Sequence, residues 1–166
     1  MRHGALVRPD VLDLLDATEM MVATALAIGG GWLSPNRLGS AAGCAEEAVV
    51  PALAELTELG IVKRRPDGVP VVAHSLIASR LREICPPERV RAIRIALVDM
   101  VDSNGPGGAF VAAQIEALAD PVLALLGVQI CLRRCRACLV LGEVPDGLSF
   151  LERAERLLQI GRRPQI

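Results

Sequence analysis

The chain has 166 residues, of which 52% are hydrophobic, and its formal net charge at neutral pH is -1. This length and composition allow one good core, or a small core with a packed helical extension. A protein that holds duplex DNA by itself usually carries a strong basic excess, so the charge balance argues against autonomous DNA binding. The only lysine, Lys63, is followed by Arg64 and Arg65, which excludes a P-loop ATPase within this chain because that loop needs Ser or Thr after its lysine.

The core must be built mainly from aliphatic side chains, because the only aromatic residues are Trp32, Phe110 and Phe150. Such a composition favours helix-on-helix packing, so we expect a mainly α fold. No apolar run reaches the length of a membrane span, and the N-terminus lacks the apolar region of a secretory signal. We therefore expect a cytoplasmic protein that does not enter a membrane and keeps its cysteines reduced.

The first half of the sequence predicts three helices. Apolar residues at helical spacing predict a helix or helix pair over residues 9–29, with a break near Asp16 and Ala17. The dipeptide Ser34-Pro35 is typical of a helix start, and this short helix should end at Gly43. The next helix is predicted over residues 45–59. We expect its buried side to consist of Val49, Val50, Leu53, Leu56 and Leu59.

A β-hairpin is predicted directly after these helices. Residues 61–65 and 69–73 have the character of strands, and Pro66, Asp67 and Gly68 are typical turn residues. Helix, short helix, turn, helix and hairpin in this order predict a winged helix-turn-helix. With the helices expected at 75–84 and 88–101, this domain should span residues 9–102.

The second half predicts an all-helical bundle or repeat-like tail. Residues 103–108 are rich in glycine and are expected to form a linker. A tail over residues 109–161 should contain a helix at 122–141, a turn at 142–147 and an antiparallel helix at 148–160, which is the αα-hairpin of repeat proteins. One such hairpin leaves a face uncovered, which would belong to a partner or to further sequence.

The predicted third helix has the wrong charge for reading DNA. It carries Glu46, Glu47, Glu55 and Glu58 and no basic residue, and carboxylates repel phosphates. This favours a module that packs against protein. Under the alternative interpretation, DNA binding would depend on Asn36 and Arg37 of the second helix and on Lys63, Arg64 and Arg65 of the wing.

Two further residue sets could carry chemistry. The spacing of Cys131, Cys135 and Cys138 equals the ligand triplet of radical enzymes with an iron-sulfur cluster, but these cysteines lie in a helical segment, which favours core packing. A zinc, cluster or redox site is the alternative. His74, just after the hairpin, could reach a phosphate or a partner backbone. No arrangement of side chains indicates catalysis, so we expect no enzyme activity and no bound cofactor.

Several segments together resemble a known family. They are Val11-Leu-Asp-Leu-Leu-Asp, Gly43-Cys-Ala-Glu-Glu-Ala, Leu53-Ala-Glu-Leu, Leu59-Gly-Ile-Val, Val72-Ala-His-Ser-Leu-Ile and Pro86-Pro-Glu-Arg. Their order resembles the winged-helix region and first helical repeats of LuxR-type STAND ATPase transcription regulators of the maltose-activator kind. The resemblance covers residues 11–101 and extends loosely into the tail.

The resemblance implies a winged helix that packs on a nucleotide-binding domain, with His74 near the phosphates of bound ADP in the resting state. The family's Walker motifs and its C-terminal LuxR DNA-binding domain are missing here, so ADP or ATP would be bound only together with a partner ATPase domain. We therefore predict a regulatory winged-helix module that acts through contacts with a protein or a neighbouring domain. The alternative is a small dimeric winged-helix transcription factor whose helical tail forms the homodimer.

Overall fold

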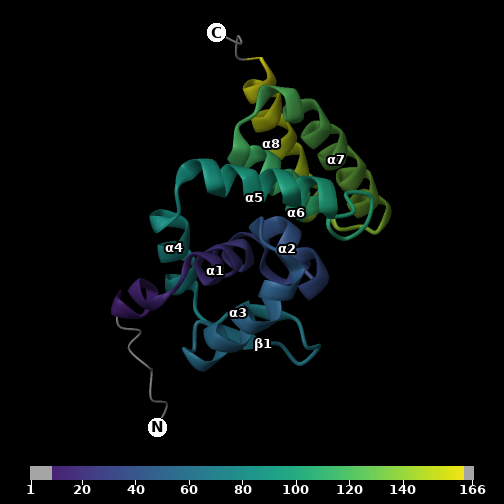
Figure 1. Ribbon diagram of the computed structural model, residues 1–166. Coiled ribbons are helices and arrows are strands. Elements are labelled where there is room, and N and C mark those ends of the chain that lie inside the picture. Colours follow the sequence, from purple (N-terminus) through teal and green to yellow (C-terminus); the bar gives the residue numbers. More distant parts are fainter. Residues whose placement is uncertain (1–8, 163–166) are drawn as a thin grey trace. The chain divides into compact units, whose positions relative to one another are not determined.

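The computed structural model describes residues 9–162, which form two compact units that divide between Ile93 and Arg94 (Figure 1). The elements of the first unit are a 3-10 helix η1 (Pro9–Leu14), α1 (Ala17–Gly29), a 3-10 turn η2 (Gly30–Trp32), α2 (Pro35–Ala42), α3 (Glu46–Glu58), β1 (Val62–Arg64), β2 (Pro70–Val72) and α4 (Ser75–Ile84). The division falls inside α5 (Pro87–Met100), and α6 (Gly108–Leu118), α7 (Pro121–Val140) and α8 (Val144–Gly161) follow. The expected mainly α class with a short antiparallel hairpin is confirmed.

Helix α1 is the central element of the first unit. It contacts α2, α3, α4 and β2, and its residues from Val22 to Leu26 are all buried. The break predicted near Asp16 is present. The Asp16 carboxylate accepts a hydrogen bond from the backbone N–H of Glu19 at 2.7 Å, and the Glu19 carboxylate accepts one from the N–H of Asp16 at 2.9 Å. This capping box stops η1 and starts α1.

Helices α2 and α3 are joined by a tight turn. Gly43 adopts the left-handed conformation with φ of 71°, and its N–H caps the end of α2. The helices approach closely at Gly39, where an added Cβ would lie 3.2 Å from the backbone oxygen of Cys44 and 3.2 Å from Val49 Cγ2. A larger side chain at residue 39 would therefore push the turn away from α2.

The buried side of α3 is narrower than predicted. Val49, Leu53 and Leu56 are buried, as expected. Val50 is 70% exposed and Leu59 is 37% exposed, which corrects their assignment to the buried side. Val50 follows Val49 directly, and adjacent residues of a helix point about 100° apart, so the two cannot share a face.

The second unit contains α6, α7 and α8 around its own core. Its buried residues include Val111 and Ile115 of α6, Cys131 of α7 and Leu157 of α8. The helical nature of the tail was predicted, but α6 was not placed as an element of its own. Helix α8 begins at Val144. The turn expected over residues 142–147 therefore ends at Glu143, and the prediction of a turn over residues 144–147 is wrong because these residues are helical. Pro145 stands in the first turn of α8, where proline is tolerated because its missing N–H needs no partner.

Helices α7 and α8 pack against each other as a pair (Figure 1). Small residues lie along their line of contact. These residues recur every seventh position: Ala124, Cys131 and Cys138 on α7, and Gly147, Ala154 and Gly161 on α8. A Cβ added to Gly161 would lie 3.4 Å from Ala124 Cβ, and one added to Gly147 would lie 3.5 Å from Leu139 Cδ2, so the end of α8 lies beside the start of α7. We call these six residues the small-residue seam. Seven-residue spacing then places Cys131 opposite Ala154 at its middle.

The segment expected to link two domains lies within the second unit. Val98 and Val101, on the C-terminal half of α5, belong to the same buried cluster as α6, α7 and α8. Residues 103–107 form a turn after α5, and Gly108 is buried at the start of α6. The compact units thus divide earlier in the chain than the predicted linker. Within residues 9–162 no helix is both long and apolar enough to cross a membrane.

Candidate functional site

The solvent side of α3 combines carboxylates with apolar side chains. Glu47, Val50, Pro51, Ala54 and Glu58 are all exposed and recur at helical spacing. We call these five residues the α3 face. Glu46 and Glu55 are also exposed and flank it. The face therefore has an apolar centre between negative charges and offers no side-chain cation to a phosphate.

The basic residues predicted for DNA binding lie on α2 and on the hairpin of the same unit. Asn36 and Arg37 are exposed on the first turn of α2. Lys63, Arg64 and Arg65 are exposed on β1 or just after it. These cations therefore lie on α2 and the hairpin, and none lies on α3.

Two of the three hairpin cations interact within the hairpin. Arg64 Nη1 donates a hydrogen bond to the backbone oxygen of Gly68 at 3.2 Å. Arg65 forms an ion pair with Asp67 at 3.0 Å, with about half of each side chain exposed. Gly68, with φ of 81°, closes the turn as its N–H donates to the oxygen of Arg65. Of these hairpin cations, Arg65 thus has its charge paired with a carboxylate within the hairpin.

His74 is exposed and stands at the N-cap of α4. Its backbone is extended, and its side chain makes no capping hydrogen bond to the first turn of the helix. The imidazole of His74 therefore does not cap the N–H groups at the start of α4. This arrangement is compatible with an anion supplied by a partner, since a helix N-terminus attracts negative charge.

The three cysteines of the predicted triplet lie on α7 and face the core of the second unit. Cys131 is 0% exposed, Cys135 is 4% exposed and Cys138 is 3% exposed. Burial raises the pKa of the Cys131 thiol, which disfavours the thiolate that a metal would need. Within residues 9–162 no three or more His, Cys, Asp or Glu side chains cluster in a way that could hold a metal ion. The cysteines pack as small apolar residues, two of them within the small-residue seam.

The structure thus brings the α2, hairpin and α3 residues into one unit and leaves the cysteine triplet in the other. Sequence reasoning missed the exposed apolar centre of the α3 face, because it counted Val50 with the core. The signal was present in the spacing: Val49, Leu53 and Leu56 already complete one helical stripe. Ala54 and Val50 are four residues apart and belong to another face.

Comparison with protein-family models, curated proteins and solved structures found no match to this chain.

Proposed function

We propose that the first unit is a winged helix-turn-helix that acts as a protein-contact module of a transcription regulator. The α3 face carries this proposal. In the element order of a winged helix, α3 takes the place of the recognition helix, and its exposed side chains are acidic and apolar. An apolar centre with a charged rim is the usual composition of a protein interface.

The charge of the face indicates the kind of partner. Glu47 and Glu58 lie at its two ends, and Glu46 and Glu55 extend the negative region. A basic protein surface with an apolar patch would complement both features. A partner ATPase domain, as the family resemblance implies, is one such partner, and His74 would then sense its bound nucleotide. The regulatory step would be a shift between a state in which the module holds its neighbour and a released state.

A binding assay with mixed-sequence duplex DNA tests the proposal. We expect the wild-type chain to show no binding, measured by fluorescence anisotropy from about 50 to about 200 mM salt. Reversal of charge in Glu47→Lys, Glu55→Lys and Glu58→Lys together should create binding that falls steeply with salt, because the helix then faces phosphates with cations. The matched control reverses three exposed carboxylates of the second unit, Glu143→Lys, Glu152→Lys and Glu155→Lys, and should bind more weakly.

The opposite outcome would establish the second candidate function, a small dimeric DNA-binding factor. The exposed Asn36, Arg37 and Lys63 favour that candidate, as do several exposed leucines on α7 and α8 that a second copy could cover. Tight, salt-dependent binding by the wild type that is lost in Arg64→Ala with Arg65→Ala would reject the protein-contact module. Light scattering would then be expected to show a dimer.

A further inference from the structure

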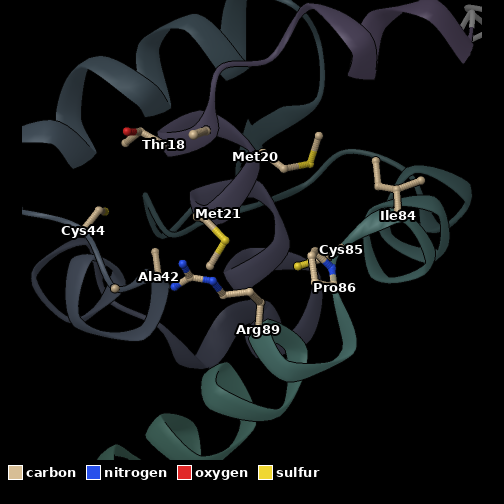
Figure 2. Close-up of a pocket in the computed structure, with 11 residues that line it drawn as sticks. Thr18, Met20, Met21, Ala42, Cys44, Ile84, Cys85, Pro86 and Arg89 are labelled. Carbon is tan, nitrogen blue, oxygen red and sulfur yellow. The ribbon is translucent and has the colours of Figure 1, made fainter.

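A pocket in the first unit lies apart from the α3 face and combines an apolar lining with a single cation. It has a volume of about 510 Å³ and is formed by the start of α1, the turn between α2 and α3, and the corner between α4 and α5. Pockets of this size commonly hold small organic molecules. Figure 2 shows its side chains and the direction in which Arg89 points.

Most of the lining is apolar and adaptable. Met20 and Met21 come from α1, Ala42 from the end of α2 and Ile84 from the end of α4. Methionine side chains adjust to irregular apolar molecules and make favourable contacts with them. Cys85 is 4% exposed, and burial raises the pKa of its thiol; Glu88 adds to this rise, whereas the Thr24 hydroxyl and the Arg89 guanidinium act in the opposite direction. The lining is therefore neutral apart from Arg89.

Arg89 is the group that indicates the charge of a ligand. It stands in the first turns of α5, and its side chain points toward Ala42 and Met21 (Figure 2). Within residues 9–162 its guanidinium makes no hydrogen bond or ion pair. No carboxylate is among the pocket-lining residues. A guanidinium beside an apolar surface without a carboxylate of the protein is complementary to a carboxylate brought by a ligand.

We propose that this pocket binds a small apolar monocarboxylate, with the carboxylate on Arg89 and the hydrocarbon part between Met20, Met21 and Ile84. An inorganic anion would leave the apolar lining unfilled, and a neutral hydrocarbon would leave the guanidinium unpaired. The proposal does not depend on the function of the α3 face, since none of the five residues of that face lines the pocket.

The test compares three probes on the full chain by isothermal titration calorimetry: octanoate, octanol and acetate. We expect octanoate to bind with a Kd of about 1 mM or tighter, octanol about tenfold more weakly, and acetate not measurably. Arg89→Gln should weaken octanoate binding about tenfold and leave octanol unchanged, because a charge-assisted hydrogen bond is lost. Lys63→Gln removes the same charge outside the pocket and should change nothing.

A second readout locates the binding site. Cys44 lines the pocket and is the least buried of the five cysteines, so bound octanoate should slow its alkylation by iodoacetamide. Ala17→Phe adds bulk at an exposed position of the rim and should abolish both binding and protection. Failure of octanoate to bind, equal affinity for octanol, or unchanged binding in Arg89→Gln would each overturn the proposal. Binding that leaves Cys44 alkylation unchanged would overturn it as well, because the ligand would then lie elsewhere.

Discussion

Replacement of Cys131 by leucine should destabilise the second unit. Cys131 is 0% exposed at the middle of the small-residue seam. The core beside Cys131 leaves little room, because a Cβ added to Gly127, one turn earlier on α7, would stand 2.9 Å from Leu157 Cδ1 and 3.1 Å from Ile115 Cγ2. Extra methylene groups in a well-packed core cost about 1–3 kcal/mol. Cys131→Ala removes only the sulfur and should cost about 1 kcal/mol, so leucine should be the worse substitution.

The measurement is thermal unfolding followed by far-UV circular dichroism, with the fluorescence of Trp32 as a reporter of the first unit alone. A protein of this length loses about 2–4 °C in Tm for each kcal/mol, so Cys131→Leu should lower the helical transition by several degrees. Leu132→Ala is the neighbouring control; Leu132 is 43% exposed, and its loss should change stability by less than about 0.5 kcal/mol. If alanine proved more damaging than leucine, the thiol would have a role that close packing does not supply, and the seam argument would be refuted.

Four other substitutions have defined outcomes. Burial raises the pKa of Glu116, but hydrogen bonds from Arg156 and Arg153 outweigh it, so the net pKa lies below its ordinary value of 4.5. The resulting stabilisation is fully present above pH 4.5 and is lost as the pH falls through the lowered pKa. Glu116→Gln should therefore lower the free energy of unfolding by about 1 kcal/mol at neutral pH. In urea unfolding measured at a series of pH values, the variant should lose less stability than the wild type as the pH falls below 4.5. Asp16→Ala should cost about 1 kcal/mol in the same assay by breaking the capping box, and a cost near zero would show that α1 does not depend on it. Leu56→Ala should cost about 2–5 kcal/mol, whereas the exposed Val50→Ala should stay within about 0.5 kcal/mol; equal costs would contradict the burial of α3.

Local signals in the sequence predicted the helices whose ends are marked by capping residues, glycine or proline. The break before α1 follows from the Asp16 and Glu19 pair, and α2 runs from Pro35 to the residue before Gly43 as expected. Helix α4 has the predicted bounds because Pro86 follows close behind it. These features involve residues within a few positions of each other, where dihedral preferences and capping decide the structure.

Features that depend on distant residues could not be predicted in the same way. The start of α8 was predicted too late because Pro145 and Gly147 are also typical turn residues. Packing of Gly147 beside Leu139 outweighs that local preference. The pocket joins Met20 and Met21 to Arg89, which only the tertiary fold brings together. No local pattern signals such a site, whereas the acidic character of the α3 face was readable directly from its glutamates.

The seven-residue spacing of the small-residue seam does not by itself determine which residues of α7 and α8 face each other. If α8 slid by seven residues, about 10 Å along the axis, small residues would again face one another, Cys138 opposite Ala154 and Cys131 opposite Gly161. The seam therefore fixes how closely the helices approach but only weakly fixes which residues pair. That choice falls to the connection between Val140 and Val144, which is too short to span such a shift. A longer flexible connection would release this restraint, so the native pairing of the two helices is encoded in the length of their turn.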